Sequence, residues 1–285
     1  MADISAADVK RLREKTGAGM MECKKALVDT AGDFDKAEEM LKEKGLAAME
    51  KRAERETKAG GVFVAASAAG DAVVLAELTC ETDFVSRNPD FVAVGQAVAK
   101  KALEKGCGAE DAELVGMVAD LATKIRENMG LKRVCAVKAA PGELIRTYVH
   151  GEAEIGVAVK CKADKPEALS GEEARGFVFS LALHVAAFAP LAVDRSRIAP
   201  GYVAEKEALF RAEMAEDEKL KGKPEAQLEG ILKGKVNKHL ANICLVEQAY
   251  VKDEKLSVAQ ALDEQSKKSG AKIEVAEFAY FKVGE

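Results

Sequence analysis

Hydrophobic positions spaced three or four residues apart in the first 58 residues predict three short helices. These positions are Ile4, Val9 and Leu12, then Met20, Cys23 and Leu27, and then Phe34, Ala37, Met40 and Leu41. Gly17 and Gly19 interrupt the pattern after the first stretch, and Gly32 with Asp33 interrupts it after the second. Glycines at such places commonly end helices. Residues 49–58 are charged on all sides, so residues 1–58 are expected to form a compact three-helix domain and its linker.

Beyond residue 58 the same order of hydrophobic and polar segments occurs twice. Each copy has two apolar runs around a turn signal, then an apolar helix, and then a β-like segment. The helix and closing segment cover residues 89–103 and 133–139 in the first copy, and residues 174–188 and 273–283 in the second. We predict an α+β fold with antiparallel sheets. Its two core subdomains are expected to be residues 59–140, and residues 141–201 together with 248–285.

The second copy contains an insertion, residues 202–247, in which apolar residues alternate with dense charge. Gly222, Lys223 and Pro224 break this insertion in the middle. Its apolar stripe is narrow enough to be buried against one other helix. We therefore predict an inserted antiparallel helical hairpin of the coiled-coil type. Its candidate roles are self-association into a homodimer, contact with a partner, and bracing of the core.

The formal net charge of −5 gives no general attraction for nucleic acid phosphates or an anionic membrane. Aromatic residues are only 5% of the chain and Trp is absent, which disfavours a base-stacking surface. The six cysteines have no metal-ligand or redox-motif spacing and indicate reduced thiols of a cytoplasmic protein. The start shows no signal peptide, and the most apolar stretch, residues 177–193, contains His184 and Pro190. The expected partners are proteins, with no direct nucleic acid and no membrane.

The three histidines, His150, His184 and His239, are the natural acid–base candidates, and they are scattered along the chain. His184 lies in an apolar helix and is expected to be a hydrogen-bonded core residue, while His239 on the charged hairpin is expected to be solvated. The sequence has no phosphate-binding loop, HExxH or GxSxG motif. We therefore predict no cofactor, no metal and no catalytic residue. An enzyme whose groups meet only in space stays an alternative.

The TDFV segment, Thr82-Asp83-Phe84-Val85, follows a predicted strand and precedes a helix start at residues 88–90. The residues alone favour a Phe84 ring that folds back into the core, with Thr82 or Asp83 bonding turn amides. The alternative is an exposed ring at a rigid strand end, which can enter a slot on a partner with little loss of entropy. Asp83 would then give the contact its direction.

Two other places leave similar alternatives open. Met20 and Met21 follow the glycine-rich break and are either core residues of a helix or part of a contact surface. Because consecutive helical residues point in different directions, at least one of the two side chains should face outward. His150 at a hairpin bend is more simply ordinary surface than a binding group. A non-catalytic scaffold that uses the three-helix domain and the hairpin is a further alternative.

Four motifs are specific when they occur together in this order. They are TGAGMMECKKAL at residues 16–27, CETDFVSRNPDF at 80–91, YVHGEAEIGVAV at 148–159 and ALHVAAFAP at 182–190. With them the chain resembles the elongation factor Ts family, the bacterial guanine nucleotide exchange factors for elongation factor Tu. The resemblance implies a helical domain like the ubiquitin-associated (UBA) domain, a two-subdomain α+β core and a coiled-coil protrusion.

The resemblance also implies a partner and a site. The TDFV segment would insert against the GTPase domain of elongation factor Tu beside its magnesium site, and would promote GDP release without covalent chemistry. Met20, Met21 and Lys24 would contact the same GTPase domain. His150 would lie on the partner-facing surface of the core. Linkage requires that the factor and the bound GDP then weaken one another by equal free energies.

Overall fold

The computed structural model describes residues 4–285, and for residues 46–50 it describes the backbone alone. The chain divides into two compact units, which are described separately here. One unit comprises the chain through Ala136 together with Val149–Gly156 and Phe281–Glu285. The other comprises Val137–Tyr148 and Val157–Tyr280.

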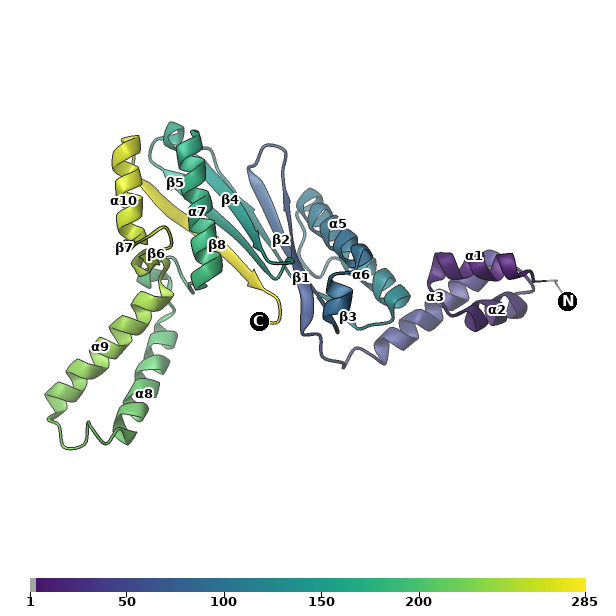
Figure 1. Cartoon of the computed structure of the whole chain (residues 1–285), viewed down its shortest axis with the longest axis horizontal. Coiled ribbons are helices and arrows are strands. Elements are labelled where there is room, and N and C mark those ends of the chain that lie inside the picture. Colours follow the sequence, from purple (N-terminus) through teal and green to yellow (C-terminus); the bar gives the residue numbers. More distant parts are fainter. Residues whose placement is uncertain (1–3) are drawn as a thin grey trace. The chain divides into compact units, whose positions relative to one another are not determined.

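The first unit begins with three helices around a small core of their own (Figure 1). They are α1 (Ala6–Thr16), α2 (Met20–Asp29) and α3 (Phe34–Glu50). Helix α1 starts where the Ser5 hydroxyl accepts a hydrogen bond from the Asp8 N–H at 3.1 Å, and it ends at Gly17, whose φ of 69° is left-handed. The buried cluster is Val9, Leu12, Cys23, Ala26, Leu27, Ala37 and Leu41. The predicted helices are confirmed, because the spacing of their apolar residues supplies this core.

The rest of the first unit is built on a three-stranded sheet with the order β1-β2-β3. Its elements are β1 (Ala59–Ala66), β2 (Ala72–Cys80), α4 (Asp83–Ser86), α5 (Pro89–Lys105), α6 (Ala112–Ile125) and β3 (Met129–Lys138). Strands β1 and β2 are antiparallel, and α5 packs on both (Figure 1). The buried rings of Phe63 and Phe91 meet edge to face with centroids 5.9 Å apart. Gly95 is required here, since a Cβ at that position would lie 2.2 Å from the Phe63 ring.

A second three-stranded sheet has the order β4-β5-β8. Its strands and the accompanying helices are β4 (Glu143–His150), β5 (Ile155–Ala163), the 3-10 helix η1 (Pro166–Leu169), α7 (Glu172–Phe188), α10 (Val258–Ser269) and β8 (Ile273–Lys282). Both halves therefore run strand, strand, short helix, long helix, second long helix and strand. The predicted α+β fold is confirmed, and so is the repeat. The second long helix of each half, α6 or α10, was not anticipated from the sequence.

Between α7 and α10 the chain forms the predicted helical hairpin (Figure 1). The elements of this region are η2 (Arg195–Arg197), α8 (Pro200–Glu216), α9 (Glu225–Ile243), η3 (Leu245–Glu247), β6 (Ala249–Tyr250) and β7 (Asp253–Ser257). Its buried cluster is Ala192, Ile198, Met214, Leu232, Val236, Leu240 and Cys244. The two helices are joined by an ion pair between Arg211 and Glu229 at 2.5 Å. The apolar stripe is thus used between α8 and α9 themselves.

The hairpin corrects one sequence-based expectation, because His239 is not a solvated residue. Its side chain is half-buried, and its Nε2 lies 3.0 Å from the Tyr202 hydroxyl in a hydrogen bond. The imidazole also stacks on the Tyr202 ring and meets the Phe210 ring edge-on, with centroids 5.9 Å and 5.7 Å away. The dense charge around His239 concealed the fact that it shares the inner face of α9 with Val236 and Leu240.

Helix α7 is apolar along most of its length and keeps His184 fully buried. The imidazole Nε2 pairs with Gln248 Oε1 at 2.9 Å, and Nδ1 accepts a hydrogen bond from the Val251 N–H at 3.2 Å. The expectation of a hydrogen-bonded core histidine is confirmed. Burial lowers the pKa of this imidazole. Within residues 4–285 no helix is both long enough and apolar enough to cross a membrane.

Candidate functional site

The short helix α4 carries Phe84 on the molecular surface. The Phe84 side chain is 83% exposed, whereas Val85, one residue later, is 8% exposed and belongs to the core cluster of the first sheet. Directly after α4, Asn88 caps the next helix through a hydrogen bond from the Asp90 N–H, and Pro89 occupies its first position. A turn held between β2 and α5 therefore presents an aromatic ring to solvent. The interpretation in which this ring folds back into the core is wrong.

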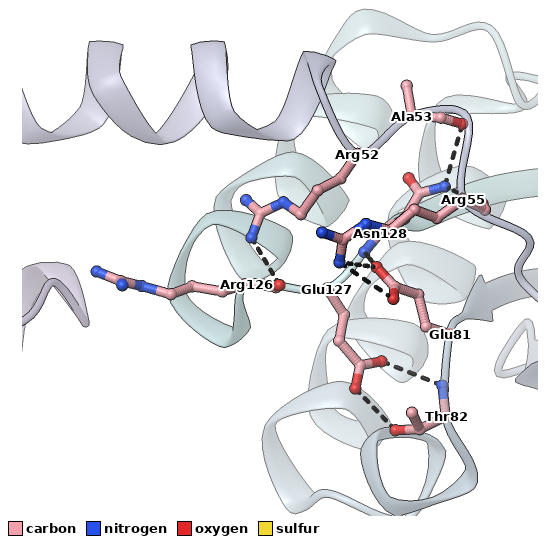
Figure 2. A network of polar contacts seen from close by, with 8 residues as sticks. All are labelled: Arg52, Ala53, Arg55, Glu81, Thr82, Arg126, Glu127 and Asn128. Carbon is pink, nitrogen blue, oxygen red and sulfur yellow. Dashed lines mark hydrogen bonds and ion pairs between the residues drawn. The ribbon is translucent and has the colours of Figure 1, made fainter.

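Thr82 fixes the start of α4 with its hydroxyl and its backbone polar groups (Figure 2). Its hydroxyl accepts a hydrogen bond from the Val85 N–H at 3.4 Å and donates one to Glu127 Oε1 at 2.8 Å. The Thr82 N–H donates to Glu127 Oε2 at 3.1 Å, and its carbonyl oxygen accepts from the Cys80 thiol at 3.2 Å. Burial raises the pKa of the Cys80 thiol to about 12, so this sulfur stays a donor at neutral pH.

Asp83 is exposed beside Phe84. One of its oxygens lies 3.8 Å from Arg87 Nη2, and Arg87 also pairs with Glu152 at 2.6 Å. All three side chains are more than half exposed, so these ion pairs contribute little to stability. The four residues of the TDFV segment thus divide into two roles. Thr82 and Val85 hold the turn, while Asp83 and Phe84 are offered to solvent.

Behind the TDFV segment lies a polar network that joins the linker to the connection between α6 and β3 (Figure 2). Glu81 accepts hydrogen bonds from the Asn128 N–H at 2.6 Å and from Arg55 Nη1 at 3.4 Å. The Asn128 amide donates to the carbonyl oxygens of Arg55 at 2.7 Å and Ala53 at 3.2 Å. Because the residue before Thr82 takes part, the linker and the TDFV segment share one anchor.

The same connection also contacts the three-helix domain. Arg126 has a left-handed backbone with a φ of 68°, and its guanidinium pairs with Glu22 on α2. This hydrogen bond, together with one from the Gly19 N–H, lowers the pKa of the Glu22 carboxyl. The Arg126 carbonyl oxygen accepts a hydrogen bond from Arg52 Nη1 at 2.6 Å. Helix α2 is therefore bonded directly to Arg126, the residue that precedes Glu127.

The remaining predicted site residues are also exposed. Met20 and Met21 are 42% and 75% exposed, so the interpretation of this pair as core is wrong. Lys24 is also exposed, and Cys23 of the same helix points into the core. His150 is exposed at the end of β4. Exposure is what a contact role requires, and the contacts themselves stay predictions.

Sequence reasoning missed Glu127 and Asn128, although they organise the site. Glu127 lies 45 residues from Thr82 along the chain, and no spacing rule joins the two positions. The available signal was a polar Arg-Glu-Asn run between an amphipathic helix and an apolar strand. Such a run indicates a connection at the end of a helix. It does not indicate which segment the carboxylate will bind.

Comparison of the sequence with known proteins matches this chain to translation elongation factors. The family model described as Elongation factor TS matches residues 81–285, beginning one residue before Thr82. Elongation factor Ts of Treponema denticola is 47% identical over 282 residues, which are 99% of each chain. The proteins of the same name from Borrelia garinii and Borreliella burgdorferi are 40% and 39% identical over 285 residues, the whole of each chain. The chain belongs to the elongation factor Ts family.

Proposed function

We propose that this protein promotes GDP release from elongation factor Tu by binding its GTPase domain. The TDFV segment enters beside the nucleotide site and displaces Mg²⁺, after which GTP can bind. No covalent bond is made or broken in this exchange. Family membership supports the partner, and the exposure of Phe84 on a fixed turn is the observation that supports the route.

The Phe84 side chain has the properties of an interface anchor. A phenylalanine buries about 150 Å² or more when it enters a pocket, and buried aromatic rings dominate binding energy at many interfaces. Fixing α4 in the free protein lowers the entropy that is lost on binding. Asp83 extends from the same turn and places a negative charge next to the ring.

Exchange follows from competition between two arrangements of the partner's nucleotide site. Bound GDP and Mg²⁺ stabilise one arrangement, because the metal offsets the phosphate charge. Phe84 and Asp83 stabilise the other, in which the metal site is disordered. The free energy by which this protein weakens GDP binding equals the free energy by which GDP weakens the binding of this protein.

One ring cannot supply the whole effect. Moving a two-state equilibrium from 1:99 to 99:1 takes about 5.5 kcal/mol of differential affinity, more than an ordinary single contact gives. The exposed face of α2 with Met20, Met21 and Lys24, and the surface around His150, supply the additional binding energy. Substitutions there should weaken the complex more than they slow the release step within it.

The direct test is stopped-flow release of fluorescent GDP from elongation factor Tu. Wild-type protein should accelerate release, and Phe84→Ala should reduce that acceleration about 30- to 900-fold, the rate equivalent of a contact worth about 2–4 kcal/mol. Leu209→Ala is the matched control, since Leu209 is an apolar side chain 47% exposed on the hairpin. Equal rates for Phe84→Ala and wild type would contradict the proposal.

A further inference from the structure

Helix α4 is too short to be stable by itself. It has four residues, and an isolated helical segment of that length does not form in water because nucleation costs more than one or two hydrogen bonds return. Its direction therefore depends on the contacts at its two ends. Val85 fixes one side in the core, and Thr82 with Glu127 fixes the other.

The Glu127 carboxylate holds the start of α4 with both of its oxygens. Its two oxygens accept separate hydrogen bonds, from the Thr82 N–H at 3.1 Å and the Thr82 hydroxyl at 2.8 Å. Donating to Glu127 orients the hydroxyl so that its lone pair faces the Val85 N–H at 3.4 Å. Hydrogen bonds to an ionised acceptor are stronger than neutral ones. One carboxylate thus sets both the strand end and the first turn of α4.

Glu127 is itself held on both sides by its neighbours in the chain. Before it, the left-handed Arg126 ends α6, with its N–H bonded to the Ala122 carbonyl oxygen and its own carbonyl oxygen bonded to Arg52. After it, the Asn128 N–H is bonded to Glu81 at 2.6 Å. The backbone on both sides of Glu127 is therefore held by hydrogen bonds, and these bonds fix the position of its carboxylate (Figure 2).

We infer that Glu127 is a positioning residue for nucleotide exchange, whose carboxylate fixes the direction in which α4 presents Phe84 and Asp83 to the GTPase. This inference rests on the proposed function. Without the carboxylate the domain keeps its core, because Val85 stays buried and α5 begins at its own cap. The α4 turn then opens locally, and the partner must supply the free energy that orders it.

Glu127→Gln tests the role with little change in volume. Glutamine keeps one acceptor oxygen for the Thr82 N–H and presents an NH₂ group to the Thr82 hydroxyl, so the hydroxyl no longer donates to it and neither bond has an ionised acceptor. We expect stopped-flow GDP release by Glu127→Gln to be about tenfold slower than by wild type. Thr82→Val, which keeps the shape of the side chain and removes the hydroxyl that donates to Glu127 Oε1, should behave in the same way.

Glu143→Gln is the matched control. The Glu143 carboxylate also accepts a backbone hydrogen bond, from the Ala140 N–H at 2.8 Å, and it belongs to the other unit. The control should keep the wild-type release rate. In a Phe84→Ala background, Glu127→Gln should change the rate less than about twofold, since residues acting through one another are not additive. An unchanged rate for Glu127→Gln, or the same tenfold loss in both backgrounds, would overturn the inference.

Amide hydrogen exchange of residues 85–87, whose N–H groups are bonded within the α4 turn, gives a second readout that does not depend on the GTPase. We expect Glu127→Gln to accelerate exchange of these amides at least about tenfold, while Glu143→Gln leaves them unchanged. Unaltered exchange in Glu127→Gln would refute the positioning role. If wild-type protein fails to accelerate GDP release, the proposed function fails by itself, and the amide measurement still decides whether Glu127 fixes α4.

Discussion

In the first half of the core the segment between β2 and α5 exposes Phe84, whereas the segment in the same place of the second half, between β5 and α7, buries Leu169. The two exposures are 83% and 4%. Both segments are single short helical turns, α4 and η1. The comparison shows that this connection exposes an aromatic ring in one half, where its neighbour Val85 is buried, and buries the corresponding leucine in the other.

The two connections are also tied down in parallel ways. Thr82 binds Glu127, shortly before β3, and Asp164 exchanges hydrogen bonds of 2.8 Å and 3.2 Å with the backbone of Lys272, directly before β8. A left-handed residue ends the preceding helix in both halves, with φ values of 68° for Arg126 and 65° for Gly270. Its carbonyl oxygen accepts a hydrogen bond from a cationic side chain, Arg52 or Lys165, at 2.6 Å.

This parallel explains how an exposed aromatic turn fits into the repeated fold. In each half, hydrogen bonds to a residue just before the third strand fix the connection between the second strand and the long helix. The residues within that connection can therefore vary. In the first half the core place is taken by Val85, which leaves Phe84 outside. The exposure of Phe84 therefore depends on which of two adjacent apolar residues enters the core.

The largest effect on stability should separate the two segments. Leu169→Ala removes a buried side chain and should lower the free energy of unfolding by about 2–5 kcal/mol. Phe84→Ala removes an exposed one and should change it by no more than about 0.5 kcal/mol. Urea denaturation followed by circular dichroism measures both. Similar losses for the two variants would remove the contrast between the halves.

The second half should also be the more acid-sensitive at its core, because of His184. Burial lowers the pKa of its imidazole below the unfolded value of 6.5, so the folded state binds the proton less well. The stability it contributes is complete above about pH 6.5 and is lost as pH falls toward the folded pKa, by up to about 1.4 kcal/mol per pH unit. His184→Gln should flatten this part of the curve. Parallel curves for the two proteins between pH 7 and 5 would contradict the expectation.

A smaller effect concerns the left-handed residue before the third strand. Gly270→Ala places a Cβ on a backbone with a φ of 65° and should destabilise the protein by about 1–2 kcal/mol. Gly230→Ala within α9 is the control, and should stabilise by about 0.5–1 kcal/mol. Thermal melting of both variants checks the sign. A neutral Gly270→Ala would show that this half does not need the left-handed residue.

The sequence predicted the large helices and strands but not the hydrogen bonds between residues far apart in the chain. Spacing located the three N-terminal helices and the repeat, because those patterns follow local geometry. The exposure of Phe84 went against what the residues alone favoured, since Val85 filled the core place that either residue could take. The role of Glu127 could not be predicted, because its partner Thr82 lies 45 residues away in the sequence. His239 was expected to be solvated because charged residues surround it in the sequence, whereas its imidazole is hydrogen-bonded to Tyr202.

The most direct test asks whether the side chain at position 84 enters the partner. Phe84→Trp labelled with 5-fluorotryptophan gives a single fluorine signal, because the chain has no other Trp. In a variant that still accelerates GDP release, the fluorine resonance should show the full solvent isotope shift in the free protein. It should lose that shift when unlabelled, nucleotide-free elongation factor Tu is added. A fluorine resonance that keeps its full solvent isotope shift in the complex would contradict the account.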